Sequence, residues 1–170
     1  MTSKFPWWKF IAGYLFFLLS HEIYGWTGGN LIGIVFGEMY ESVYTHMKML
    51  FLAYLFVSLI DLVVRRKSIE MQPFLYSRML LLASMPWMMI AMFYAPQAVG
   101  FAVEGTAELV WGIVMTGVGL YFCIRMEEPF EAMPLRSSAR AMIVLAFLAA
   151  VVTYVGFSFA VPDNFFYVIR

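Results

Sequence analysis

Charged residues are scarce in this chain: Asp, Glu, Lys and Arg make up 13% of its 170 residues, whereas soluble domains carry about 25%. Hydrophobic residues make up 63% and aromatic residues 19%. So little charge excludes an ordinary soluble domain, because too few polar side chains remain to cover a surface in water. The net charge of zero provides no basic surface for nucleic acid. We therefore expect an integral membrane protein with no nucleic-acid partner.

Cysteine and the common catalytic motifs are also lacking. The single cysteine, Cys123, cannot form a disulfide bond within the chain. The sequence contains no HExxH, no CxxC, no glycine-rich phosphate loop and no nucleophile elbow. These absences argue against a hydrolase or a conventional zinc enzyme.

Long apolar runs, in contrast, are abundant. A run of about 20 mostly apolar residues can cross the hydrocarbon core of a bilayer. Five segments meet this criterion: about 5–24, 47–64, 75–95, 104–124 and 140–160. The sequence predicts an all-α polytopic membrane helix bundle of five transmembrane helices, forming a single domain over residues 1–170.

Residues 27–45 are predicted to form one further helix that does not span the membrane and is either interfacial or re-entrant. Their apolar run, Leu31 to Phe36, is too short to cross, and two glutamates follow it. Gly28 and Gly29 are expected to form a turn before it, with Asn30 as the N-cap.

The basic residues predict the orientation. With five spans and a cytoplasmic N-terminus, nine of the eleven basic residues lie inside, and only Lys48 and Arg170 lie outside, as the positive-inside rule requires. A sixth span at 27–45 would move the basic run 65–67 to the outside. The C-terminus is therefore expected to be external. Residues 125–140, with their charges, two prolines and serines, are interpreted as a solvated cytoplasmic loop.

This topology places both histidines and several acids near the outer face. The candidate ligand- or ion-binding residues are Glu38, Glu41, Glu104, Glu108, His21 and His46. Helical spacing would put Glu38, Glu41 and Thr45 on one face of the non-spanning helix. The simpler interpretation is that these acids are ordinary solvated groups of an exterior surface. Asp61, near the cytoplasmic end of its span, is expected to form a local ion pair with Arg65 four residues on.

Two stripes of small residues predict close helix packing. Gly112, Thr116 and Gly119 form one stripe in the fourth span, and Glu104 and Glu108 continue it, so both carboxylates should look into the bundle. The second stripe, in the fifth span, consists of Ala149, Thr153 and Gly156. The two stripes are expected to meet each other, or to form a homo-oligomer or a contact within a larger membrane complex.

Three functions remain open. The first is a small transporter, channel or transporter subunit that handles a cation, a proton or a small polar solute through the outer Glu/His cluster. A divalent metal is possible there, with Glu38, Glu41, His46 and Glu108 as ligands. The second is a non-catalytic membrane subunit of a redox or other complex, with haem or quinone near His21 and His46. The third is a membrane-embedded enzyme that uses Glu and His for acid–base chemistry.

Overall fold

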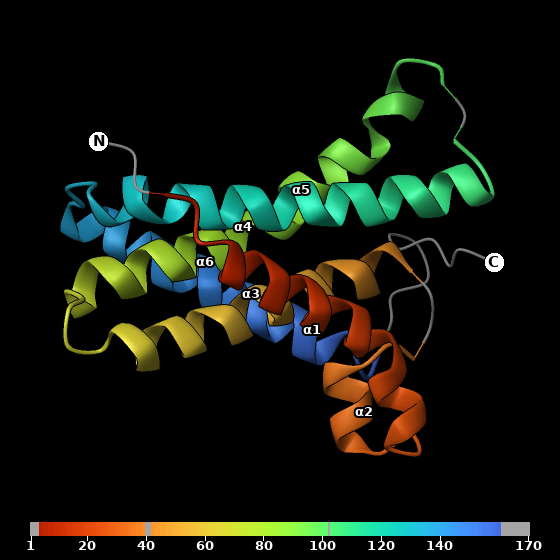
Figure 1. Cartoon of the computed structure of the whole chain (residues 1–170), viewed down its shortest axis with the longest axis horizontal. Coiled ribbons are helices and arrows are strands. Elements are labelled where there is room, and N and C mark those ends of the chain that lie inside the picture. Colours follow the sequence, from red (N-terminus) through yellow and green to blue (C-terminus); the bar gives the residue numbers. More distant parts are fainter. Residues whose placement is uncertain (1–3, 40–41, 102, 161–170) are drawn as a thin grey trace.

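The computed structural model describes residues 4–39, 42–101 and 103–160. This part of the chain contains helices and no strand. The helices are α1 (Trp7–Trp26), α2 (Leu31–Phe36), α3 (Val43–Arg65), α4 (Met71–Ala98), α5 (Thr106–Glu131) and α6 (Ser137–Gly156). All except the short α2 run along the long axis of the molecule, as Figure 1 shows.

Four of the described helices, α3 to α6, are long and apolar enough to cross a membrane. The prediction of a helical membrane protein is therefore supported, but the count of five spans is not reproduced. The first predicted span corresponds to α1, which is not among the four. Its 20 residues include Lys9, His21 and Glu22, and these polar side chains lower its hydropathy.

The segment predicted as one helix over 27–45 is divided. Its helical part, α2, contains only six residues, and α3 already begins at Val43, where the Ser42 hydroxyl accepts a hydrogen bond from the Thr45 amide at 3.1 Å. The predicted shared face is wrong, because Glu38 follows α2 whereas Thr45 belongs to α3. The third member of that face, Glu41, lies outside the described residues.

The predicted entry into α2 is confirmed. Gly28 and Gly29 have φ angles of 64° and 70°, a region that glycine adopts without steric cost. Asn30 caps the helix, since its side-chain oxygen accepts hydrogen bonds from the amides of Ile32 at 3.0 Å and Gly33 at 3.2 Å. This turn folds α2 back against the end of α1.

The predicted cytoplasmic loop at 125–140 is mostly wrong. Helix α5 continues through Pro129 to Glu131, and α6 begins at Ser137. The reason is that Glu127 is buried, with only 4% of the residue exposed, and its carboxylate binds cations from other helices. A solvated loop could not hold the carboxylate in that position.

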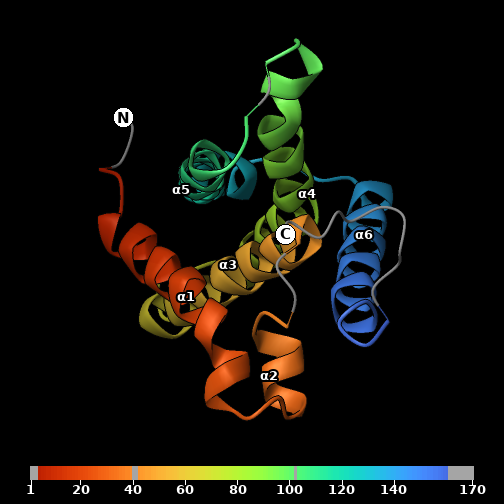
Figure 2. The ribbon, with the colours of Figure 1, turned by 90° about the vertical axis from the view of Figure 1, so that its right-hand side faces the viewer.

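The core lies around α3, with Leu50 and Tyr54 packed against Leu81 of α4 and Leu120 of α5. The small-residue stripe of α5 packs inside the chain: a Cβ on Gly119 would lie 3.3 Å from Leu50, and the Thr116 hydroxyl lies 3.8 Å from the Met89 sulfur. Helix α6 packs on α4 instead. Figure 2 shows α5 and α6 on opposite sides of α4.

The two small-residue stripes therefore do not meet within the chain. Apart from its own helix backbone and its chain neighbours, nothing in the described part of the chain lies within 4 Å of the position that a Cβ on Gly156 would occupy. For the stripe formed by Ala149, Thr153 and Gly156, the remaining prediction is a contact with a second copy of the chain or with another membrane subunit.

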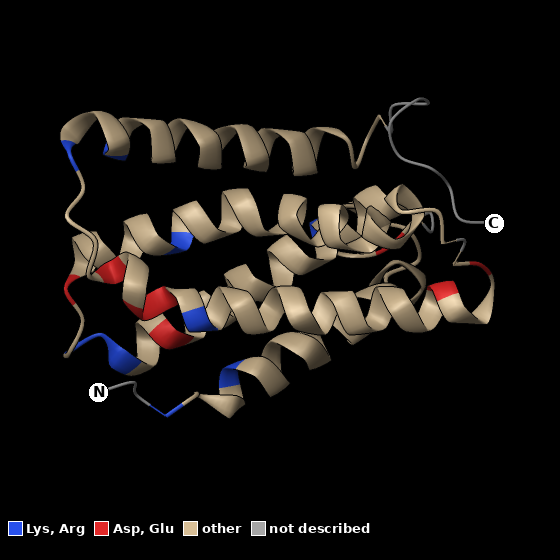
Figure 3. Ribbon diagram, turned by 90° about the horizontal axis from the view of Figure 1, so that it is seen from above, with Lys and Arg blue, Asp and Glu red and all other residues tan. Residues whose placement is uncertain are grey.

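The distribution of charge along the bundle follows the predicted pattern. Figure 3 shows Lys and Arg gathered mainly at the end of the bundle where α1 begins. The beginning of α1, the end of α3, the beginning of α4 and the end of α5 meet at this end, because Lys9, Asp61, Arg78 and Glu127 are in contact.

Replacing Gly37 by alanine should destabilise the fold of α2 against α1. An added Cβ would lie 2.5 Å from the Tyr24 backbone nitrogen, and relieving such a backbone clash costs about 1–3 kcal/mol. We expect a lower melting temperature for G37A in detergent. G25A is the matched control, because nothing lies within 4 Å of its Cβ. Equal melting temperatures for the two variants would contradict the packing of α2.

Candidate functional site

One cavity brings together several of the predicted site residues. Its volume is about 580 Å³, and it lies between the ends of α1, α3, α4 and α5. The polar residues of its lining are His21, Glu22, His46, Glu108 and Thr116. Its apolar lining includes Phe17, Leu18, Met89, Phe93, Leu109 and Ile113. The cavity is thus mainly apolar with a few ionisable groups, which is the usual composition of a small-molecule site.

The two histidines come together because the turn and α2 reverse the chain between them. His21 lies near the end of α1 and His46 in the first turn of α3, and their ring centroids are 5.6 Å apart. In each ring Nδ1 faces a carbonyl of its own helix region: His21 faces Phe17 at 3.2 Å, and His46 faces Ser42 at 2.8 Å. Because a carbonyl only accepts, each of these contacts is a hydrogen bond in the tautomer that carries a proton on Nδ1.

The four acids predicted at the outer face have different positions. Glu108 lies in the first turn of α5 and lines the cavity opposite the histidines. The Glu38 carboxylate lies 3.6 Å from His21 Nε2, so it stands beside the cavity. Glu104 precedes α5, is exposed and does not line the cavity. The remaining acid, Glu41, lies outside the described residues.

The structure therefore places His21, His46 and Glu108 in one cavity, with Glu38 next to His21. Within residues 4–39, 42–101 and 103–160, no group of three His, Cys, Asp or Glu is arranged to hold a metal ion. Glu41, one of the predicted ligands, is not in that set, so the metal site of Glu38, Glu41, His46 and Glu108 stays a prediction.

Lys48 ties the surrounding segments to α3. Its ammonium donates hydrogen bonds to the Ile34 carbonyl at 2.9 Å and to the Ser158 hydroxyl at 3.3 Å. It thereby joins α2 and the segment after α6 to the end of α3 that carries His46. The pattern of basic residues predicts only a side of the membrane for Lys48 and not these contacts.

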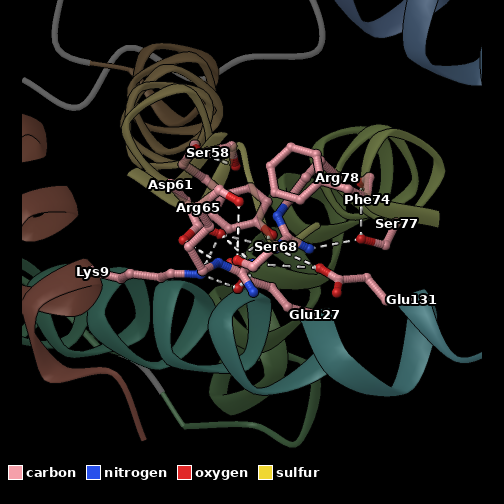
Figure 4. A network of polar contacts seen from close by, with 11 residues as sticks. Lys9, Ser58, Asp61, Arg65, Ser68, Phe74, Ser77, Arg78, Glu127 and Glu131 are labelled. Carbon is pink, nitrogen blue, oxygen red and sulfur yellow. Dashed lines mark hydrogen bonds and ion pairs between the residues drawn. The ribbon is translucent and has the colours of Figure 1, made fainter. Parts of the chain in front are cut away.

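A second polar site lies at the opposite end of the same four helices. Its six side chains, named the charge cluster here, are Lys9, Asp61, Arg65, Arg78, Glu127 and Glu131. They come from α1, α3, α4 and α5, and Figure 4 shows them pointing toward one another. Three are cations and three are anions, so the charges of the cluster balance.

Lys9 and Arg78 bridge the acids of the charge cluster. The Lys9 ammonium lies 2.7 Å from Asp61 and 2.5 Å from Glu127. Arg78 lies 3.3 Å from Asp61, 3.1 Å from Glu127 and 2.7 Å from Glu131. The Tyr54 hydroxyl donates a further hydrogen bond to Glu127 at 3.2 Å.

Four of the six side chains in the charge cluster are buried, while Arg65 and Glu131 are partly exposed. The exposed fraction is 4% for Lys9, 0% for Asp61, 3% for Arg78 and 4% for Glu127. A lone buried charge costs several kcal/mol of desolvation, so each member requires the others. The cluster therefore fixes how α1, α3, α4 and α5 meet at this end.

Sequence reasoning found only one pair of the charge cluster. The predicted ion pair of Asp61 and Arg65 is confirmed at 2.6 Å, but Asp61 also binds Lys9 and Arg78. The available signal was that Lys9 and Arg78 lie inside or beside apolar segments without an opposite charge nearby in sequence. An ionisable residue within a membrane-spanning apolar segment requires a partner from another helix.

Comparison with known protein families, curated proteins and solved structures found no match for this chain. Its function is therefore inferred from the cavity and the charge cluster alone.

Replacing Lys9 by methionine should destabilise the protein strongly. The change keeps an apolar stem but leaves Asp61 and Glu127 short of one cation, and breaking a buried ion pair costs about 3–5 kcal/mol. K9M with E127Q restores the charge balance and should recover part of the lost stability. K4M, at an exposed lysine, is the control. Thermal unfolding in detergent measures all three, and a double variant no more stable than K9M would refute the charge-balance explanation.

Proposed function

We propose that this protein is a small integral membrane transporter, or a subunit of one, that takes up a cation, a proton or a small polar solute. The observation that carries the proposal is the cavity that gathers His21, His46 and Glu108 from α1, α3 and α5. These side chains are separate in sequence, and each can bind a proton or a polar ligand. A cavity of about 580 Å³ gives room for such a ligand between helices.

The far end of the same helices is closed, as alternating access requires of one side of a transporter at a time. Between the cavity and the charge cluster the helices pack closely: Leu120 is 0% exposed, and a Cβ on Gly13 would lie 2.9 Å from it. The path beyond the cavity is therefore closed by packed side chains and then by balanced charges. In an alternating-access transporter, the closed side has to open in turn. The ion pairs of the charge cluster would separate in that step.

We further propose that α1 is a fifth span, with the N-terminus in the cytoplasm and the C-terminus outside. Helix α1 lies alongside α3, since Lys9 contacts Asp61 at one end and His21 packs on His46 at the other. Two of its polar residues, Lys9 and His21, thereby contact partners within the bundle at its two ends. The concentration of basic residues where α1 begins supports a cytoplasmic location for that end.

Cysteine labelling tests this topology. In a C123A background, cysteines replace Lys4, Ser68, Leu31 and Phe101, which are all exposed. We expect a membrane-impermeant thiol reagent to label the Lys4 and Ser68 positions from the cytoplasmic face and the Leu31 and Phe101 positions from the outside. Labelling of the Lys4 and Leu31 positions from the same face would show that α1 does not span the membrane.

The close histidine pair also suits a second candidate function, a non-catalytic redox-complex subunit with haem or quinone near His21 and His46. Paired histidines on neighbouring helices are used as haem ligands in membrane subunits. Soret absorbance of the purified protein would favour this function. An absorbance spectrum without a Soret band, together with two-sided access to the cavity, would favour transport.

Access to the cavity tests transport directly. G112C, in the C123A background, places a thiol in the cavity lining, where the Phe93 ring is the nearest neighbour at 3.5 Å. A transporter should allow an impermeant reagent to reach this thiol from each face, at different rates. V110C is the control: Val110 is 53% exposed but lies outside the cavity lining, so its thiol should face lipid and react slowly.

The charge cluster provides the second arm of this experiment. Combining G112C with K9M and E127Q removes one buried cation and one buried anion, so the cytoplasmic rate of labelling should rise. Labelling from the outer face alone, both with and without these changes, would refute transport and leave a one-sided binding protein.

A further inference from the structure

The ligand class follows from the charge, the walls and the opening of the cavity. We infer that the cavity binds an amphipathic organic cation, a molecule with one positive centre and an apolar body that enters from the lipid phase. The inference rests on the proposed function, because it names the solute for the same cavity.

The ionisable groups of the lining favour a cation. Glu22 and Glu108 contribute two carboxylates, and the other polar groups are His21, His46 and the Thr116 hydroxyl. No Lys or Arg stands among the lining residues that the structure describes. A cavity lined by one sign of charge and by apolar walls concentrates ions of the opposite sign.

The neighbours of the cavity do not cancel this charge. Glu38 lies beside His21, at 3.6 Å from Nε2. Lys48, at the same end of α3, donates to the Ile34 carbonyl and the Ser158 hydroxyl and interacts electrostatically with Glu38, so it offsets the charge of Glu38 outside the cavity lining. The remaining buried cations, Lys9 and Arg78, are held by the acids of the charge cluster at the far end.

The size and the walls favour an organic cation over a bare ion. About 580 Å³ is far more than a dehydrated ion fills and lies within the range of about 300–1,000 Å³ for small-molecule sites. Phe17 and Phe93 provide aromatic surface, which attracts organic cations. Met89 and Ile113 extend the apolar wall. Within the described residues, no three-ligand metal group competes with this assignment.

The cavity opens between α1 and α5, on a side that the proposed topology turns toward lipid. Leu18 and Leu109 line the cavity and are also 43% and 57% exposed on the outer surface of α1 and α5. Farther along, α1 and α5 close together where the Tyr14 hydroxyl donates to the Ile113 carbonyl at 3.1 Å. A ligand dissolved in the bilayer can therefore enter between the two helices above this contact.

The probe for this inference is tetraphenylphosphonium, a lipophilic cation, with tetraphenylborate as an anion of nearly the same shape. Equilibrium binding of each radiolabelled ion to the purified full chain is measured in detergent. We expect saturable binding of the cation and at least tenfold weaker binding of the anion. Equal binding of the two ions would show that charge does not select the ligand, and it would overturn the inference.

Two glutamates four positions apart provide matched variants. E108Q removes a cavity carboxylate at constant shape and should weaken binding of tetraphenylphosphonium at least tenfold. E104Q makes the same change at an exposed position outside the cavity and should stay within twofold of the unchanged protein. Unchanged affinity in E108Q, or equal losses in both variants, would contradict the inference. Matching melting temperatures show that any loss of affinity is not a loss of folding.

The outcome separates this inference from the proposed function. Absence of tetraphenylphosphonium binding overturns the organic-cation assignment, while two-sided labelling of G112C would still support transport of another solute. One-sided labelling combined with selective, Glu108-dependent binding would instead retain the ligand class and remove transport.

Discussion

The balance of buried charge is the constraint on which the rest of the structure depends. Lys9, Asp61, Arg78 and Glu127 are each at least 96% shielded from solvent, since none is more than 4% exposed, and each belongs to a different helix. In a low-dielectric interior their attraction is strong, but so is the cost of leaving any one of them alone. The four helices that carry them are therefore fixed to one another at this end, in register as well as in position.

This constraint explains why the cavity lies where it does. The helices are held together at one end by ion pairs and in the middle by Leu50, Leu120 and the close approach of α1 at Gly13. At the other end α1 contacts α3 through the two histidines, and α4 contacts α5 through the Trp111 indole and the Phe93 carbonyl, with the cavity between these two pairs. There His21 and His46, whose rings pack on each other, line a space between the helices together with Glu108. The turn at Gly28 and Gly29, together with α2, brings the two histidines together. The cavity stays open between α1 and α5.

Hydropathy was sufficient to predict the membrane class and the approximate position of α3 to α6, because each of these helices is a continuous apolar run. Local chemistry was sufficient for the turn at Gly28 and Gly29 and for the pairing of Asp61 with Arg65, since both depend on residues close in sequence. Glu127 was assigned to a loop because its main partner, Lys9, is 118 positions away. Cavity membership likewise required tertiary structure: Glu104 and Glu108 share a sequence pattern, yet α5 begins between them and only Glu108 lines the cavity.

The placement of Lys9 has a consequence for biosynthesis. Helix α1 is synthesised before the partners of its buried ammonium, since Asp61 on α3 follows Lys9 by 52 positions and Glu127 on α5 by 118. Until then, a lysine within α1 opposes stable burial of that helix in the hydrocarbon. We therefore expect α1 to take its final place in the bundle in two steps, when α3 supplies Asp61 and when α5 supplies Glu127.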